Sequence, residues 1–207
     1  MEITPIVVGQ LATNSYILHD SLGNGIIIDP GAESDTIMSY IEDKNIDVIK
    51  IVLTHGHYDH IGAVLDIVNK TGAKILIHKE DEKMLKSGRL NLSYMLGEDC
   101  SLAGADRLLE EGDIIKIGHK SLKVIHTPGH TEGGISLVLE NRAIFTGDTL
   151  FRGSIGRTDF PGGDYNTLID SIMKKIMVLD DSLILYSGHG PQSTIGHERL
   201  HNPYIDR

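Results

Sequence analysis

Short apolar runs alternate along this chain with segments of helical periodicity. Apolar runs of strand length that are bounded by turn residues predict β-strands. These runs lie at residues 3–8, 15–20, 26–29, 48–53, 74–78, 113–117, 121–126, 135–140, 143–147 and 183–188. The run at 48–53, VIKIVL, is typical of a strand that is buried on both faces.

Three segments carry apolar residues at the spacing of a helix face. They are residues 35–45, 61–69 and 165–179. Ser34 is the expected N-cap of the first helix, and Gly72 is expected to stop the second. The polar and mixed stretch at 79–112 predicts helix and loop, and a short tail follows the last strand.

This order of elements predicts a mixed α/β (α+β) protein in which helices cover two sheets. No low-complexity stretch, linker or block of charge divides the chain, so residues 1–207 are expected to form a single domain. The polar motifs lie at strand ends, where loops commonly carry function.

Composition narrows the classes of function. Apolar residues make up 40% of the chain, enough for a buried core. No apolar run approaches the ~20 residues that span a bilayer. The net charge of −10 disfavours binding to nucleic acid. The chain begins without a secretory signal pattern, and the single Cys100 cannot form an intrachain disulfide, so we expect a cytoplasmic protein.

Histidine is abundant, with 11 residues, and the first cluster follows a predicted buried strand. The segment THGHYDH places His55, His57, Asp59 and His60 within one tight loop. Imidazole and carboxylate groups are ligands suited to zinc, iron or manganese. A solvated polar loop is the alternative, and the density of ligand-type residues after a buried strand argues against it.

Three later segments each place one ligand-type residue at the end of a predicted strand. They are His130 in HTPGHT, Asp148 in FTGDT and His189 in YSGHG. A lone histidine is more often a hydrogen-bonded structural residue, so each segment is a weak signal alone. Their shared context of strand, small residue and ligand favours a common metal site.

The order THGHYDH, HTPGHT, FTGDTLF, GRTDFPGG and SGHGP resembles the metallo-β-lactamase superfamily, and within it the glyoxalase II branch. The C-terminal STIGHERLHNP resembles the tail of short bacterial glyoxalase II-like hydrolases. This resemblance covers nearly the whole chain. It implies a four-layer αββα sandwich, the metallo-β-lactamase fold, with two divalent metal ions at one edge between the sheets.

The same resemblance implies the metal ligands residue by residue. His55, His57 and His130 correspond to the ligands of the first ion, and Asp59, His60 and His189 to those of the second. Asp148 corresponds to the carboxylate that bridges both. The expected ions are Zn²⁺, with Fe or Mn as alternatives. The remaining histidines match no ligand position, and we expect His126 to have a structural or supporting role.

Two ions held roughly 3.5–4 Å apart lower the pKa of a shared water to about 7. The resulting hydroxide is the expected nucleophile, and Asp59 is the residue expected to orient it. A thiolate leaving group needs little protonation, because thiol pKa values lie near ~8.5. The chemistry therefore favours thioester hydrolysis, and the resemblance points to a small-molecule thioester such as S-lactoylglutathione.

Other residues near the motifs leave alternatives open. Arg157 and Asp159 are either a brace for the metal ligands or an ordinary surface ion pair. Tyr58 is expected to pack or to line the pocket, and Cys100 to be uninvolved. Longer glyoxalase II chains hold glutathione with a helical C-terminal extension, and this chain stops soon after His189, which leaves the thiol carrier open.

Three other functions compete with thioester hydrolysis. A persulfide dioxygenase on the same fold uses a single iron and has a similar GRTDF segment, although SGHGP resembles the hydrolases more. A β-lactamase is disfavoured by the missing signal peptide, and a nuclease by the short acidic chain. A structural metal domain, the non-catalytic alternative, would have a closed four-coordinate site, often with cysteines.

Overall fold

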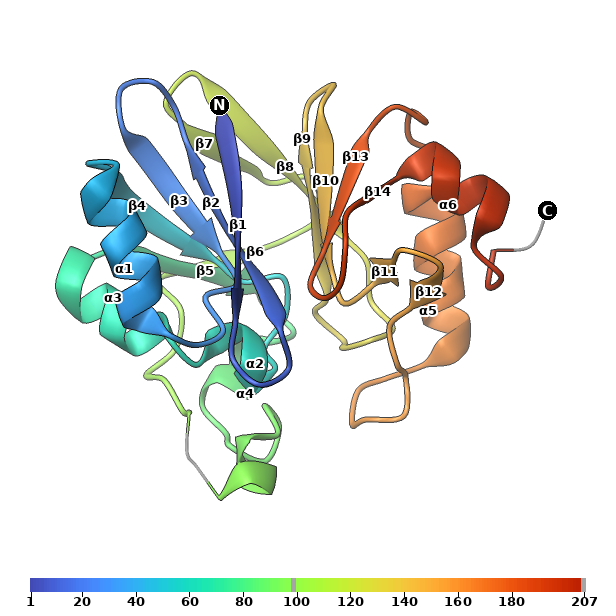
Figure 1. Ribbon diagram of the computed structural model, residues 1–207. Coiled ribbons are helices and arrows are strands. Elements are labelled where there is room, and N and C mark those ends of the chain that lie inside the picture. The colour runs from blue at the N-terminus through green and yellow to red at the C-terminus, as the bar shows by residue number, and fades with distance from the viewer. Residues whose placement is uncertain (98–99, 206–207) are drawn as a thin grey trace.

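Two six-stranded sheets pack face to face in a computed structural model that describes residues 1–97 and 100–205 (Figure 1). The first sheet has the order β1 (Glu2–Val8), β2 (Thr13–His19), β3 (Asn24–Ile28), β4 (Asp47–Val52), β5 (Lys74–His78) and β6 (Arg107–Leu109). The second has the order β14 (Ser193–Thr194), β13 (Ile184–Ser187), β10 (Ala143–Gly147), β9 (Ile135–Leu139), β8 (Lys120–His126) and β7 (Ile114–Ile117).

Helices cover the outer face of each sheet, which completes four layers. Helices α1 (Ser34–Asp43) and α3 (Val64–Thr71) pack on the first sheet, and α5 (Tyr165–Ser171), the π-helix η2 (Ile172–Ile176) and α6 (Ile195–His201) pack on the second (Figure 1). The shorter elements are α2 (Tyr58–Ile61), α4 (Glu82–Leu85), the 3₁₀ helix η1 (Ser93–Leu96), and the hairpin β11 (Leu150–Phe151) with β12 (Ser154–Ile155). The expected αββα sandwich is confirmed.

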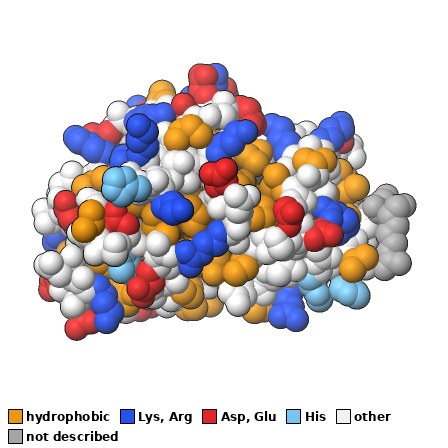
Figure 2. Space-filling view, turned by 90° about the horizontal axis from the view of Figure 1, so that it is seen from above, with side chains coloured by type: hydrophobic (Ala, Val, Ile, Leu, Met, Phe, Trp, Pro, Cys, Tyr) orange, Lys and Arg blue, Asp and Glu red, His pale blue; other side chains and the backbone are white. Residues whose placement is uncertain are grey.

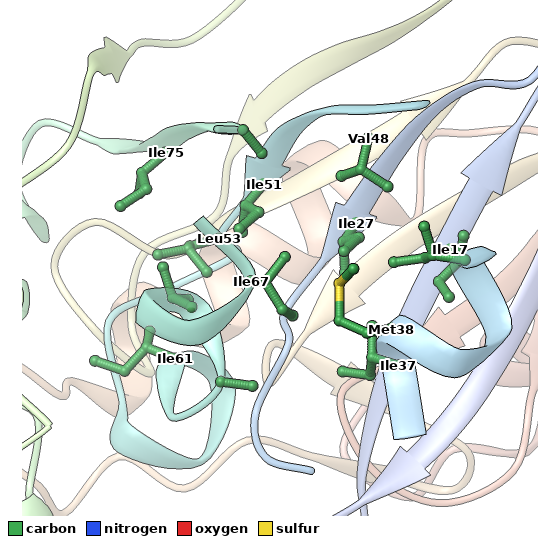
Figure 3. Close-up of a cluster of buried hydrophobic side chains, with 14 of the residues drawn as sticks. Ile17, Ile27, Ile37, Met38, Val48, Ile51, Leu53, Ile61, Ile67 and Ile75 are labelled. Carbon is green, nitrogen blue, oxygen red and sulfur yellow. The ribbon is translucent and has the colours of Figure 1, made fainter. Parts of the chain in front are cut away.

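The period-two alternation of side chains divides the core into layers. In β3, Ile27 contacts the helix-side cluster, whereas Ile26 and Ile28 belong to the cluster between the sheets. Figure 3 shows the helix-side cluster, in which Ile37 and Met38 of α1 lie close to Ile27. Strands buried on both faces need apolar residues at every position, which explains the continuous apolar runs in the sequence.

Strand β4 departs from the prediction of full burial. Only its last two residues, Ile51 and Val52, are fully buried on opposite faces, whereas Ile49 is 37% exposed. The strand is therefore anchored most firmly at the end that leads into the histidine-rich loop.

Several predicted boundaries were wrong for local reasons. Ser34 is not the N-cap: Glu33 occupies that position with φ 54°, and the Ser34 hydroxyl donates to Asp66 on α3. The predicted helix at 61–69 is divided into α2 and α3, because the motif loop itself turns helical at Tyr58. The helix at 165–179 changes to a π-helix and ends at Ile176.

The stretch at 79–112 contains the expected helix and loop, and also strand β6, which its sequence did not predict. Residues 98–99 of this stretch lie outside the described residues, as do 206–207 of the tail. The tail forms β14 and α6 and is part of the second half of the sandwich.

Strand direction places the polar motifs at one edge of the sandwich. Strands β3, β4 and β5 run parallel, so their C-terminal ends share that edge, at the bottom of Figure 1. The opposite edge, seen in Figure 2, carries acidic and basic side chains interspersed with apolar ones. No helix among the described residues has the length and apolar character to cross a membrane.

The two sheets also meet through a stacked pair of histidines that are not proposed ligands. The rings of His78, at the end of β5, and His126, at the end of β8, lie 4.0 Å apart with an interplanar angle of 15°. Burial and the neighbouring His126 lower the pKa of His78 from 6.5 to about 4, with Lys79 adding to the effect and Glu110 and Glu111 opposing it. His78 is therefore neutral in the folded protein at neutral pH.

This neutral state predicts a pH dependence of stability. Below pH 6.5 the unfolded chain binds a proton on His78 that the folded chain does not bind until about pH 4. Stability is therefore lost as the pH falls between these values, by up to about 3 kcal/mol. Chemical denaturation from pH 7.5 to 4.5 should show a shallower loss for His78→Phe than for the wild type. His119→Gln, at an exposed position, is the control, and identical profiles for all three proteins would contradict the prediction.

Candidate metal centre

The loop after β4 folds around a buried carboxylate at the end of β3. Asp29 has φ 51° and accepts hydrogen bonds from the Thr54 amide at 2.7 Å, from the Thr54 hydroxyl at 2.6 Å and from His60 Nδ1 at 2.9 Å. Since the Thr54 hydroxyl donates to Asp29, it can accept from His55 Nδ1, which lies 3.1 Å away. Asp29 thereby fixes the orientation of two ring systems, and the sequence motifs did not identify it.

Three histidines converge beneath this loop. His55, His57 and His130 are each at most 4% exposed, and their ligand atoms lie within 4.8 Å of one another. His57 Nδ1 and His130 Nε2 face each other at 3.0 Å. Two nitrogens bound at 2.0–2.1 Å to one tetrahedral ion lie roughly 3.3 Å apart. The spacing of these imidazoles is therefore close to that of ligands to a shared ion.

A second group lies beside the first and contains a carboxylate. Asp59, His60 and His189 also place their ligand atoms within 4.8 Å of one another. His189 Nε2 lies 3.2 Å from Asp59 Oδ2, and His60 Nε2 lies 3.6 Å from the same oxygen. The outer ring nitrogen of His189 donates to the Leu11 carbonyl at 3.0 Å, which turns its inner nitrogen toward the site.

Asp148 joins the two groups. Its Oδ2 lies 3.7 Å from His130 Nε2 and 3.5 Å from His189 Nε2, and its Oδ1 lies 3.4 Å from His60 Nε2. Gly188 makes this approach possible, because a Cβ there would lie 2.2 Å from Asp148 Oδ1. The structure therefore brings the seven residues selected from the sequence motifs together, with Asp148 between the two groups.

Burial and charge give the two groups different protonation. Burial and the neighbouring histidines lower the pKa of His55 well below its usual value, and that of His57 to about 3. Burial also opposes a charge on His60 and His189, yet the facing carboxylates raise the pKa of His60 well above its usual value and that of His189 to about 10. The first group thus offers neutral imidazoles, whereas in the second the carboxylates of Asp59 and Asp148 stabilise protons on His60 and His189, which a bound cation would displace.

The polar atoms left without partners fit a metal ion. His55 Nε2, His60 Nε2 and Asp148 Oδ1 are buried and lack a hydrogen-bond partner among the described residues. Buried polar atoms are normally paired, so atoms of this kind that point to a common space indicate a missing ligand. Neutral imidazole and carboxylate donors suit a divalent transition metal. The residues present therefore fit the implied ions.

Asp81 is a further buried carboxylate that the motif search missed. It accepts from the Gly56 amide, the Thr131 hydroxyl at 2.7 Å and the Gly133 amide at 2.7 Å, and so ties the loop of His55 and His57 to the loop that follows His130. Burial raises its pKa to about 6. Asp81 lies three residues after the end of β5, but as a single acidic residue in a polar stretch it carries no motif.

The other candidates lie around this centre in different ways. Arg157 and Asp159 form a bidentate, exposed ion pair, and the Arg157 guanidinium lies 3.7 Å from the centre of the Phe160 ring. It is the Arg157 carbonyl that touches a proposed ligand, by accepting from His130 Nδ1 at 2.8 Å. The brace is thus made by the backbone, and the side chains form the surface pair.

His126, Tyr58 and Cys100 do not belong to the ligand groups among the described residues. His126 bonds to the Glu132 carbonyl and stacks on His78. Tyr58 begins α2, and its amide donates to Asn91. The amide of the half-buried Cys100 donates to Ser93.

Comparison with known proteins identifies the family. The sequence profile of the metallo-beta-lactamase superfamily matches residues 8–189. The chain belongs to this superfamily. Membership and the His/Asp cluster at the edge of the sandwich together support the use of divalent metal.

Individual members of the superfamily are similar over the whole chain. Hydroxyacylglutathione hydrolase GloC of Haemophilus influenzae is 38% identical, over 100% of this chain and 98% of its own. The crystal structure of BLEG-1 B3 metallo-beta-lactamase has a TM-score of 0.95 and 36% identity, with complete coverage of both chains. The structure of TTHA1623 in a di-iron-bound form has a TM-score of 0.88 and 32% identity, and covers 98% of this chain and 100% of its own.

The geometry predicts that His57→Ala removes metal from the first group. Its two remaining imidazoles cannot hold an ion as three can, so we expect about one ion per chain in place of about two. Elemental analysis of the purified variant measures this loss. His126→Ala is the matched control, since His126 lies at the same edge outside the ligand groups. A full metal complement in His57→Ala would contradict the ligand assignment.

Asp148→Ala should weaken metal binding at both positions, because Asp148 contacts ligands of both groups. Titration with a chelator should release both ions at lower chelator concentration than in the wild type. Release of one ion with the other held as tightly as before would mean that Asp148 serves only one position.

Proposed function

We propose that this superfamily member is a metal-dependent thioester hydrolase with two ions in its site. The observation that carries the proposal is the position of Asp148 between a three-histidine group and an Asp/His group. A binuclear centre of this composition supplies, when loaded, a hydroxide near neutral pH. The similarity to a hydroxyacylglutathione hydrolase supports the thioester as substrate.

Asp59 is the proposed catalytic residue. Its Oδ2 accepts from the Thr13 hydroxyl at 3.2 Å and lies 3.2 Å from His189 Nε2, so its carboxylate has a fixed direction. Burial opposes ionisation of Asp59, but His60 and His189 lower its pKa, which keeps it an acceptor at neutral pH. An ionised carboxylate held in this way can accept a proton from the attacking water and orient it.

The protonation of the site favours a leaving group that departs as an anion. Burial opposes ionisation of Asp148 as well, yet His60 and His189 hold its pKa well below the usual range. Neither Asp59 nor Asp148 therefore carries a proton to donate near pH 7, and His60 and His189 would give up their inner protons on binding the metal ions. A thiolate leaves without protonation, since its conjugate acid has a pKa near ~8.5, whereas an amine anion does not. This difference favours thioesters over amides.

Zinc is the proposed ion, and iron is the principal alternative. All seven ligand-type residues are imidazoles or carboxylates, which both metals accept. The di-iron form of TTHA1623 supports iron as the ion, and the alternative of a persulfide dioxygenase would use a single iron. The similarity to BLEG-1 supports β-lactam hydrolysis as a second candidate reaction.

Steady-state kinetics on a small panel test the proposal. The panel holds S-lactoylglutathione, a 2-hydroxyacyl thioester of a smaller thiol, a β-lactam and glutathione persulfide, and each assay is run on zinc-loaded and iron-loaded protein. We expect metal-dependent hydrolysis of the thioesters without oxygen uptake. Asp59→Asn should lower kcat by ~100-fold or more, because it removes the proton acceptor and a carboxylate ligand of the second group.

His126→Gln is the control and should retain the wild-type kcat. Turnover of the persulfide alone, with oxygen consumed by the iron form, would mean that the protein is a dioxygenase and not a hydrolase. Turnover of the β-lactam alone would mean that the protein hydrolyses amides and not thioesters.

A further inference from the structure

The C-terminal helix α6 contains a buried carboxylate that no step described above uses. Glu198 is fully buried, although α6 already contributes Ile195 to the apolar cluster under the second sheet. Burying a carboxylate costs several kcal/mol unless hydrogen bonds compensate. An apolar residue would dock the helix without this cost, so the carboxylate requires another explanation.

Two partners of Glu198 lie on segments that follow proposed ligands in the chain. Its Oε2 accepts from the Gly153 amide at 2.8 Å, in the turn of the β11–β12 hairpin, and from Asn202 Nδ2 at 2.9 Å. Its Oε1 accepts from the Ser193 hydroxyl in β14. Its carboxylate oxygens therefore bind the hairpin that follows Asp148 and the strand that follows His189.

Asn202, at the end of α6, holds the same hairpin from a second direction. Its amide donates to the Ser154 carbonyl at 3.1 Å and to the Phe151 carbonyl at 3.4 Å, besides Glu198. The turn of the hairpin is thus fixed at an amide and at two carbonyls by two side chains of the C-terminal motif.

The segment that follows the hairpin packs closely against two of the proposed ligands. Gly156 follows β12, and a Cβ there would lie 1.8 Å from the Asp148 carbonyl and 3.4 Å from His130 Cβ. The next residue, Arg157, accepts with its carbonyl from His130 Nδ1. A displacement of the hairpin would therefore move the backbone of Asp148 and release the ring of His130.

From these contacts we infer that Glu198 and Asn202 are positioning residues for the metal centre, acting through the β11–β12 hairpin on Asp148 and His130. The inference rests on the proposed metal-dependent function. It assigns to the ERLHN segment a part in metal affinity, in addition to closing the second half of the sandwich.

The helix offers a matched control on its other side. Arg199 donates to the carbonyls of Met177 and Leu179 and pairs with Asp181, and so anchors the same helix to the segment after η2. Arg199→Ala loosens α6 without removing a contact to the hairpin. A purely structural role for Glu198 would give the two variants the same properties.

The test compares zinc affinity, by competition with a chelator, in the wild type, Glu198→Ala, Glu198→Gln, Asn202→Ala and Arg199→Ala. We expect Glu198→Ala and Asn202→Ala to bind zinc ~10- to 100-fold more weakly, the effect typical of removing a group that orients a ligand. Glu198→Gln should be intermediate, because its carbonyl can still accept from Gly153. Arg199→Ala should bind zinc as the wild type does.

Hydrogen exchange of the zinc-loaded proteins gives a second reading that needs no substrate. Peptides covering residues 148–157 should exchange faster in Glu198→Ala and Asn202→Ala than in Arg199→Ala. Wild-type zinc affinity in both hairpin variants, or an equal loss in Arg199→Ala, would overturn the inference.

If Glu198→Ala does not fold, as judged by circular dichroism, Asn202→Ala and Glu198→Gln give the same comparison. Neither measurement depends on thioester turnover. A wild type that binds zinc without hydrolysing thioesters would refute the proposed function alone, and unchanged zinc affinity in the variants of an active hydrolase would refute this inference alone.

Discussion

The close packing of two partly buried carboxylates against imidazole nitrogens is the constraint on which the rest of this structure depends. Asp59 and Asp148 are partly buried beside His60 and His189, and each carboxylate favours a cation close by. The first group of histidines has no such charge and offers neutral nitrogens. A site of this kind remains assembled only if every ring and carboxylate is held from outside, because its members otherwise leave for solvent.

Oxygen atoms of residues outside the ligand set fix the ligand rings by hydrogen bonds. Asp29 accepts from His60, the Arg157 carbonyl accepts from His130, and the Leu11 carbonyl accepts from His189. These contacts come from the end of β3, from the segment after the β11–β12 hairpin and from the β1–β2 turn, so the geometry of the ligands depends on how distant segments pack together. Asp81 adds a direct link between the two loops that carry the first group. The fold and the chemistry are therefore coupled, and outer contacts that fix ring orientation are the expected means of tuning such a site.

Much of the site could be predicted from the sequence, because its ligands lie at the ends of apolar strands. The run before Thr54 and the glycine before His189 mark such ends, and the close spacing of His55, His57, Asp59 and His60 is a strong local pattern. Asp29 and Asp81 could not be recognised in this way. Each is a single acidic residue in an ordinary turn, and its role arises from contacts with residues 25 to 52 positions away along the chain.

The sequence by itself determined the strand runs, the αββα architecture through its family resemblance, and the set of ligand-type residues. Those features depend on local pattern, namely apolar periodicity and the type of residue that follows each strand. Only the tertiary structure decided that Asp148 lies between the two groups, that Arg157 acts through its carbonyl, and that Glu198 is buried beneath the β11–β12 hairpin. These features depend on which strand ends and loops lie together at one edge. That arrangement is stabilised by packing between residues far apart in the chain.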